Sequence, residues 1–429
     1  MIMSLFRKSK TDSGSRYYLL GLCVYEYKRK DFYRYYSVFG LQIFRKSLKS
    51  RKLVQAEYQL QHLAERYRHL PNDERLYLCF DCLEDSNVEA IDAWTLFLYL
   101  QKENIPSRYF ILKDNPLYAQ LVAGNKLKDV VAVENNLEVL TLHSELVARS
   151  KYVFCSFGYT RSDILSRLPC SKYVFIEHGV TLLKKRIASF YISPDLPGAR
   201  MLVPTQLTLD FYRAKDFMSG KRLCCGMPRW DNLSPGTGTR DRVNLFVFFT
   251  WRVSCKKSKK SELLYLSQIR EFVTNLLRCY KNEVRIHFGL HHSLQNLQTG
   301  TGLPPEVNQV SPTEISTMIR KADLFITDYS SVCFDFMYMD VPTIFYRFDA
   351  EVTHPDERDN QDADDAAQED SRLYNVFYDE QAAMDKIDFY VRNGCQLESE
   401  LRARNEQIFW TRENNCKALI ELLNEDAYV

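Results

Sequence analysis

The sequence lacks the short motifs that mark the commonest nucleotide and hydrolase sites. It contains no Walker loop, no G-x-G-x-x-G, no H-E-x-x-H and no G-x-S-x-G. Each of these motifs builds a phosphate cradle, a zinc site or an activated serine at a fixed spacing. If the chain binds a nucleotide, it must therefore hold the phosphates by another device.

Long apolar runs are also missing. No stretch reaches the roughly 20 apolar residues of a transmembrane helix, and the first residues hold no run long enough for a signal peptide. The 12 cysteines are scattered from Cys23 to Cys416, without the spacing of a disulfide or zinc framework. We expect reduced thiols in a cytosolic protein. At the lone pair Cys79 and Cys82 we expect packed thiols, with a metal or redox site as the alternative.

The charge is nearly balanced in total but unevenly distributed. The formal net charge is +2, yet residues 1–55 carry 13 Lys and Arg against three acids. Two similar segments, 17–30 and 35–46, each join an aromatic and aliphatic patch to a cationic cluster. This combination favours an anionic membrane surface, where each basic residue contributes about 1 kcal/mol. The alternative is that the segments form two short strands packed on the rest of the protein. We expect no nucleic-acid partner.

From about residue 74, short apolar runs alternate with amphipathic segments. A chain of 429 residues with 45% hydrophobic residues is long enough for two domains. The pattern predicts helices at 51–70, 88–103 and 137–148. It predicts strands at 76–80, 109–112, 130–133, 152–155, 173–176, 245–249, 284–288, 324–327 and 343–346. This alternation indicates an α/β fold, with two Rossmann-like doubly wound domains facing a cleft (GT-B type) and a basic N-terminal extension.

The clearest break in the pattern is the Gly-, Pro- and Ser-rich segment 233–239, where we place a hinge. The predicted parts are listed in chain order: a basic aromatic extension with a linker helix at 1–72, a Rossmann-like domain at 73–234, a second at 235–395, and closing helices at 396–429.

Two places in this pattern could carry chemistry. An apolar strand ends at Thr327-Asp328, and Ser330-Ser331 follow where a helix would start, so free N–H groups could attract an anion. The alternative is an ordinary serine cap on a core helix. His178-Gly179 directly follow another strand, at the sheet edge where open α/β sheets bind ligands. Imidazole there could act as a general base, although a structural histidine is the alternative.

Five segments together resemble the ordered motifs of a known family. They are residues 177–180 (Glu-His-Gly-Val), 226–231 (Gly-Met-Pro-Arg-Trp-Asp), 250–252 (Thr-Trp-Arg), 290–291 (Leu-His) and 327–335 (Thr-Asp-Tyr-Ser-Ser-Val-Cys-Phe-Asp). Over roughly residues 75 to 390 the chain is similar to the CDP-glycerol glycerophosphotransferase family of teichoic acid primases and polymerases.

The resemblance implies a metal-independent transferase without a cofactor. Such an enzyme moves glycerol phosphate or ribitol phosphate from a CDP-alditol to a hydroxyl of a growing capsule, teichoic-type or lipopolysaccharide acceptor, polymeric or lipid-linked, and releases CMP. Residues 73–234 would be the acceptor domain and residues 235–395 the CDP-donor domain. The protein would work in the cytoplasm, peripherally on the inner face of the cell membrane through residues 1–55.

The resemblance also assigns site residues. His178, as general base, and His291 would be catalytic. The donor-binding residues would be Gly179, Arg229, Thr250, Trp251, Arg252, Gly289, Leu290, Ser330, Ser331 and Asp335. Two arginines could clamp phosphate oxygens in a fork, and Asp335 suits a hydroxyl. The alternatives are an ion pair between Arg229 and Asp231, and a core position for Trp251.

The chain departs from the family beside both histidines. Val180-Thr181 and His292 stand where the family usually has Thr-Pro and Pro. The acceptor, the choice between glycerol and ribitol, single addition or polymerisation, and the oligomeric state therefore stay open. Two other functions remain: a GT-B glycosyltransferase using a CMP- or UDP-sugar, and an inactive membrane-associated assembly protein.

Overall fold

The computed structural model describes residues 6–11, 14–19, 22–30, 33–38, 41–47, 51–71, 74–81, 91–156, 173–176, 179–180, 200–215, 221–234, 241–250, 252, 255, 258–290, 302–311, 314–349 and 373–425. The chain divides into two compact units. The first comprises Met1–Leu70 and Leu137–Arg149, and the second comprises Pro71–Asn136 and Ser150–Val429.

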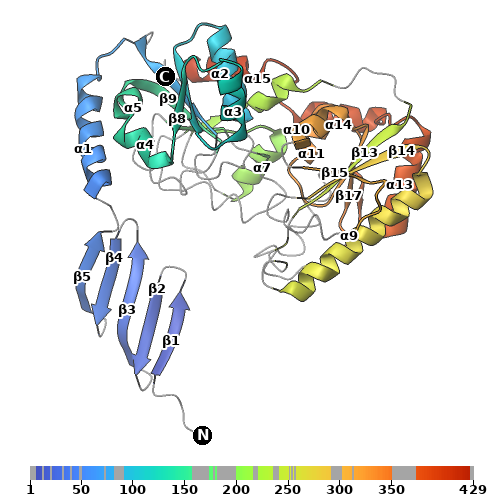
Figure 1. Cartoon of the computed structure of the whole chain (residues 1–429), viewed down its shortest axis with the longest axis horizontal. Coiled ribbons are helices and arrows are strands. Elements are labelled where there is room, and N and C mark those ends of the chain that lie inside the picture. The colour runs from blue at the N-terminus through green and yellow to red at the C-terminus, as the bar shows by residue number, and fades with distance from the viewer. Residues whose placement is uncertain are drawn as a thin grey trace. The chain divides into compact units, whose positions relative to one another are not determined.

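The first unit contains an antiparallel sheet of five strands in chain order (Figure 1). The strands are β1 (Phe6–Thr11), β2 (Gly14–Leu19), β3 (Leu22–Lys30), β4 (Tyr33–Val38) and β5 (Leu41–Ser47). Helix α1 (Arg51–Arg66) follows, and the unit also holds α4 (Asn136–Thr141) and α5 (Ser144–Arg149). The Tyr67 hydroxyl, just after α1, donates to the Glu145 carboxylate of α5 at 2.6 Å.

The two similar basic segments of this sheet are hairpins with the same register. In the β2–β3 hairpin the pairing shifts between Tyr17 and Tyr18, and in the β4–β5 hairpin it shifts between Tyr36 and Ser37, 19 residues later. Such a shift adds one residue to one strand and increases the local twist. The alternative of two short strands is wrong in number, because each segment contributes to two strands.

The register also separates the basic residues by face, since successive residues of a strand alternate between faces. One face takes Lys8, Lys10, Tyr17, Tyr25, Tyr27, Arg29, Arg34, Tyr36, Phe44 and Lys46, and no acid among the described strand residues. We call it the acid-free face. The opposite face takes Arg7, Arg16, Lys28, Lys30 and Arg45 together with Glu26.

The second unit begins with a parallel sheet of seven strands in the order β12-β11-β10-β9-β6-β7-β8. The strands are β6 (Leu76–Phe80), β7 (Ser107–Leu112), β8 (Val130–Val133), β9 (Ser150–Cys155), β10 (Tyr173–Phe175), β11 (Arg200–Leu202) and β12 (Lys221–Leu223). Its helices include α2 (Asp92–Lys102), α3 (Pro116–Ala123) and α7 (Gln206–Lys215). The strand order reverses between β6 and β9, as in the Rossmann fold.

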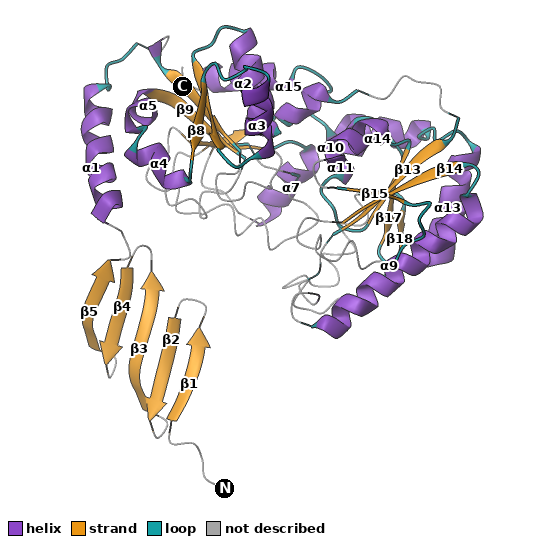
Figure 2. Ribbon diagram, in the orientation of Figure 1, coloured by secondary structure: helices purple, strands orange, loops and turns teal. Residues whose placement is uncertain are grey.

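A second parallel sheet of six strands follows, in the order β15-β14-β13-β16-β17-β18 (Figure 2). The strands are β13 (Val243–Phe249), β14 (Val284–Leu290), β15 (Asn308–Val310), β16 (Leu324–Thr327), β17 (Thr343–Tyr346) and β18 (Val376–Phe377). The helices are α9 (Lys259–Tyr280), α10 (Ile315–Lys321), α11 (Cys333–Tyr338), α13 (Glu380–Arg392), α14 (Ser399–Ile408) and α15 (Asn415–Glu425). Here the order reverses between β13 and β16.

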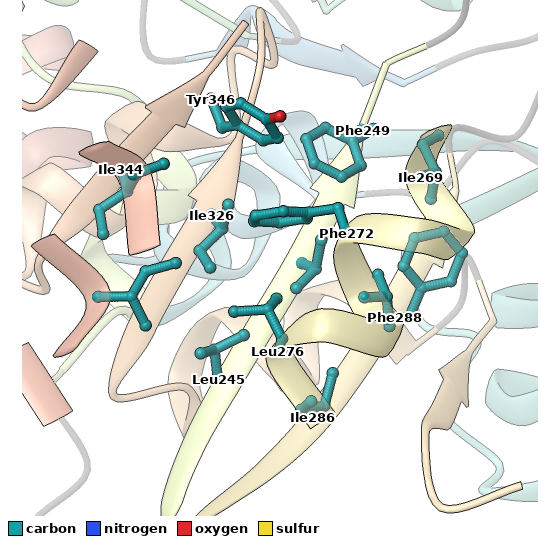
Figure 3. Packing of buried hydrophobic residues seen from close by; sticks show 14 of the residues in the cluster. Leu245, Phe249, Ile269, Phe272, Leu276, Ile286, Phe288, Ile326, Ile344 and Tyr346 are labelled. Atoms are coloured by element: carbon teal, nitrogen blue, oxygen red, sulfur yellow. The ribbon is translucent and has the colours of Figure 1, made fainter. Parts of the chain in front are cut away.

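Helices pack on both faces of this second sheet. On one face, Phe272 and Leu276 of α9 lie among the buried side chains of β13, β14 and β16 (Figure 3), and Ile387 and Tyr390 of α13 join the same cluster. On the other face, Phe336 of α11 stacks on Phe325 with the ring centroids 4.1 Å apart. The sheet is therefore doubly wound, as the alternation of strands and helices predicts.

Most of the predicted elements are present at the expected residues. All nine predicted strands form, whereas β11, β12, β15 and β18 are two or three residues long and give no readable periodicity. The single helix predicted at 137–148 is wrong, because the structure has α4 and α5 there. The predicted hinge falls largely on residues 235–240, outside the described ranges. No helix within those ranges is both long and apolar enough to cross a bilayer.

The packing of α9 gives a stability prediction. Phe272 is 1% exposed, so replacing it with Ala removes buried apolar surface and leaves a cavity. We expect Phe272→Ala to lower the free energy of unfolding by about 3–5 kcal/mol in urea denaturation. Leu263 lies on the same helix and is 57% exposed, so Leu263→Ala should change it by less than about 0.5 kcal/mol. Equal effects of the two changes would contradict this packing.

Candidate functional site

The switch point of the second sheet lies between the carboxyl ends of β13 and β16. Thr250 follows β13 and Asp328 follows β16, and the two residues are buried. The Asp328 carboxylate accepts hydrogen bonds from the Thr250 N–H at 3.0 Å and the Thr250 hydroxyl at 3.2 Å. It also accepts from the N–H of Tyr329 at 2.6 Å. Open α/β sheets bind ligands at this point, and the residues predicted to bind the donor include Thr250 beside it.

Arg252 is buried beside this pair and is held by two carboxylates. Its Nε and Nη2 donate to Asp349 at 2.6 and 3.0 Å, and Nη2 lies 2.8 Å from Asp328. Its Nη1 donates to the Thr250 hydroxyl at 2.9 Å. The guanidinium carbon also lies 5.2 Å from the ring centre of Tyr329, within cation–π range. The fork predicted to clamp phosphate is therefore directed at carboxylates in the structure.

Ser330 and Ser331 form the turn between β16 and α11. The Ser330 side chain accepts from the N–H of Val332 at 3.3 Å, so it caps the turn locally. Among the described residues, no acceptor lies against the backbone N–H groups of Ser330 and Ser331. The two N–H groups and the Ser331 hydroxyl are thus the donors that this turn can offer an anion.

Gly179, from the 177–180 motif that follows β10, lies against this turn. A Cβ atom added at Gly179 would lie 2.6 Å from the Ser331 hydroxyl oxygen and 3.2 Å from its Cβ. The close approach therefore requires glycine. His178, Trp251 and His291 lie outside the described residues, so their predicted roles stay predictions.

Arg229 joins the two sheets of the second unit. It lies in the short helix η4 (Pro228–Asn232) and is 7% exposed. Its Nε and Nη2 donate to the Asp335 carboxylate of α11 at 2.9 and 3.2 Å. Its Nη1 donates to Asp92, at the start of α2, at 2.7 Å. The Asp335 carboxylate also accepts from the Trp230 indole at 2.6 Å, so both of its oxygens already have partners.

Asp231, offered above as an alternative partner of Arg229, instead holds the C-terminal helix. Its carboxylate accepts from the N–H groups of Asn415 at 2.6 Å and Cys416 at 2.9 Å, at the start of α15. Trp230, between the two charged residues, stacks on Tyr338 with the ring centroids 4.6 Å apart. Three consecutive residues of the 226–231 motif thus tie together α2, α11 and α15.

Two predicted donor-binding residues lie within strand β14. A Cβ at Gly289 would come within 3.1 Å of the Phe248 ring, so this glycine allows two neighbouring strands to pack. Leu290 belongs to the hydrophobic cluster under α9. Their positions at the carboxyl end of β14 agree with the predicted edge, but their described contacts are packing contacts.

The first sheet has a matching arrangement that the sequence reading missed. Asp81 follows β6 and accepts from the hydroxyl of Ser156, which follows β9, at 2.9 Å. It also accepts from the N–H groups of Ala93 and Trp94 at 3.1 Å each. The signal was an acidic residue directly after a fully apolar strand. Both switch points are thus closed by one aspartate and one hydroxyl side chain.

Most cysteines of the described part of the chain are buried thiols, whereas Cys224 is partly exposed and Cys279 is exposed. Cys79 is fully buried in β6, and burial raises the pKa of its thiol well above the usual value. Its partner in the lone motif, Cys82, lies outside the described residues. Within the described ranges, no group of three or more His, Cys, Asp or Glu side chains could hold a metal ion. Metal independence stays a prediction.

These features define the class: an α/β protein built on two Rossmann-type parallel sheets. Solved structures share this fold at low identity. The wall teichoic acid polymerase TagF is 14% identical with a TM-score of 0.53, and the match covers 88% of this chain and 97% of that chain. A putative UDP-N-acetylglucosamine 2-epimerase from Listeria monocytogenes is 12% identical with a TM-score of 0.53, over 83% and 96%. The predicted fold class is confirmed.

One segment of the sequence matches a known family. Residues 211–411 match the family of CDP-glycerol:poly(glycerophosphate) glycerophosphotransferases. The minor teichoic acid biosynthesis protein GgaB of Bacillus subtilis (strain 168) is 23% identical over 372 residues, which are 78% of this chain. The match spans only 38% of GgaB. The predicted resemblance to this family is confirmed.

The contacts of Arg252 give a prediction that separates two roles. Arg252→Gln leaves Asp328 and Asp349 buried without their cation, which typically costs 3–5 kcal/mol. We expect a large fall in the urea midpoint, while Arg278→Gln, an exposed change on α9, leaves it unchanged. A variant with the wild-type midpoint that no longer binds a CDP donor would instead show that the guanidinium acts on the ligand.

Proposed function

We propose that the protein transfers glycerol phosphate or ribitol phosphate from a CDP-alditol to a hydroxyl of a growing cell-surface polymer, releasing CMP. The observation that carries the proposal is the turn at Ser330-Ser331, with free N–H donors at the switch point of a Rossmann-type sheet, inside a glycerophosphotransferase-family segment. A phosphoryl transfer depends on positioning and on donors to the phosphate oxygens, which such a turn provides.

In this proposal the residues of the site have separate roles. Ser330, Ser331 and the backbone at Gly179 face the diphosphate, and His178, one residue before Gly179, takes the proton of the attacking hydroxyl. Thr250, Arg252 and Asp328 fix the floor of the site through their buried hydrogen bonds. The ion pair of Arg229 and Asp335 holds the Ser330-Ser331 turn in place. The remaining residues that contact the CDP-alditol are Trp251, Gly289, Leu290 and His291.

The proposal also excludes bound metal and cofactor from the reaction and assigns a polymeric or lipid-linked acceptor. Purified protein should release CMP from CDP-glycerol or CDP-ribitol after treatment with a chelator. A glycosyltransferase of the same fold would instead turn over a CMP- or UDP-sugar. An inactive assembly protein would turn over none of these donors.

Replacing His178 separates catalysis from binding. We expect His178→Ala to reduce CMP release by at least a hundredfold, because a positioned general base contributes about 10²–10⁴-fold. Thermal protection by the intact CDP-alditol should persist, since binding to the native state does not need the base. His62→Ala, an exposed change on α1, is the control. Full activity of His178→Ala would remove this residue from the mechanism.

We further propose that residues 1–55 hold the protein peripherally on the anionic inner face of the cell membrane, in the cytoplasm. The acid-free face of the sheet is the side that suits such a surface. It joins cations to aromatic residues, and the 19-residue repeat places a similar aromatic pair on each hairpin, Tyr17 with Tyr25 and Tyr36 with Phe44. Aromatic rings and cations together favour the interface of an anionic bilayer.

Two charge variants of equal size test this attachment. Gln at positions 8, 29, 34 and 46 removes four cations from the acid-free face, and Gln at 7, 28, 30 and 45 removes four from the other. At about 1 kcal/mol per cation, the first variant should bind anionic phosphatidylglycerol vesicles more than a hundredfold more weakly, and the second should lose much less. Equal losses would refute the choice of face. Binding to soluble polyanionic polymer but not to vesicles would refute the membrane partner.

A further inference from the structure

The buried arginine between the two sheets has one carboxylate more than its charge requires. Arg229 carries one positive charge, and both Asp92 and Asp335 contact it within hydrogen-bonding distance. Asp92 is 3% exposed and Asp335 is 2% exposed. When all three groups are ionised, the cluster holds a net charge of −1 away from water. Buried charge without full compensation is unfavourable.

The unfavourable burial of charge is seen at Asp92, whose ionised form is disfavoured. Burial raises its pKa to about 6, the Arg229 cation opposes the shift, and the Asp81 carboxylate adds to it. The other charged or titratable groups around it are Asp335 of α11 across the arginine, and Cys416 of α15, whose thiol pKa is raised by burial. The Asp92 carboxylate accepts two hydrogen bonds from Arg229, one from its Nη1 and one from its backbone N–H.

The ionised form of Asp92 therefore weakens the fold at neutral pH. Its pKa is higher in the folded chain than the ordinary value near 4, so the folded chain binds more protons between about pH 4 and pH 6. The stability contributed by this group is present at low pH and is lost as the pH rises through about 6. A carboxylate kept only for stability would not behave in this way.

The position of Asp92 suggests what the carboxylate does instead. It begins α2, whose first N–H groups bind Asp81 at the switch point of the first sheet. Through Arg229 it reaches Asp335, which lies in the first turn of α11, shortly after the Ser330-Ser331 turn. One continuous chain of buried contacts thus runs from the edge of the first sheet to the proposed phosphate turn in the second.

We propose that Asp92 is a positioning residue, which orients Arg229 so that Asp335 and the Ser330-Ser331 turn are held at a fixed place relative to the first sheet. Only the expected loss of catalytic rate depends on the proposed function. Asp92 contacts neither donor nor acceptor and acts through Arg229. A misplacement of about 1 Å at a reacting centre can cost on the order of a hundredfold in rate.

The test is Asp92→Asn, which removes the charge with little change of shape. We expect its melting temperature to equal or exceed that of wild type at pH 7.5, with the advantage disappearing by pH 5. Hydrogen exchange of residues 329–335 should be at least tenfold faster than in wild type at pH 7.5. The kcat/KM for the CDP-alditol should fall at least tenfold, mostly in kcat.

Two matched variants define the comparison. Asp231→Asn removes a carboxylate of the neighbouring motif that caps α15, so it should lower the melting temperature at both pH values. Asp114→Asn is an exposed change near α3 and should alter none of the three readouts.

Three results would overturn the proposal. They are a lower melting temperature of Asp92→Asn at pH 7.5, a failure of this variant to fold, and unchanged exchange at residues 329–335. Either of the first two would show that the carboxylate is an ordinary stabilising partner of Arg229, and the third would show that it does not hold the turn. If no CDP-alditol is turned over by wild type, the proposed function fails, but the melting and exchange measurements still decide the role of Asp92.

Discussion

The structure of the second unit depends on one buried guanidinium, that of Arg229. It bridges the start of α2 beside the first sheet and the start of α11 beside the second. Removing this guanidinium would leave two buried carboxylates without their cation, and such a loss typically costs 3–5 kcal/mol. Trp230 and Asp231, the next two residues, extend the same junction to α11 and α15. The 226–231 motif, in which the sequence predicts the donor-binding residue Arg229, thus connects α2, α11 and α15.

The two sheets solve the same problem at their switch points. In parallel sheets the carboxyl ends of the two central strands lie side by side where the strand order reverses. In the first sheet Asp81 and Ser156 occupy these ends, and in the second Asp328 and Thr250 do. The Asp81 carboxylate accepts hydrogen bonds from the start of α2. The Asp328 carboxylate instead binds Arg252 and the N–H of Tyr329, in the turn that leads to Ser330 and Ser331. Within the described residues, the turn after the second switch point keeps the N–H groups of Ser330 and Ser331 without an acceptor.

The sequence predicted the central elements well and the contacts of the site poorly. Strands such as β6, β13 and β16 are continuous apolar runs, and burial on both faces makes them readable without tertiary information. Asp92 and Asp349 could not be found in this way. They lie 137 and 97 residues from the arginines that they bind, and no local pattern marks an ion pair over that distance. The arginine side chains predicted to bind phosphate bind carboxylates instead, which local patterns could not reveal because these partners are distant in sequence.

The sequence by itself determined the α/β class, the two sets of strands, the basic extension and the family motifs, because these follow from periodicity, composition and local spacing. The tertiary structure decided which charges meet. It paired Arg229 with Asp92 and Asp335, and Arg252 with Asp328 and Asp349. It also placed Gly179 against Ser331. Buried charges must find partners wherever the fold brings them together, and that depends on the order of strands in the sheets.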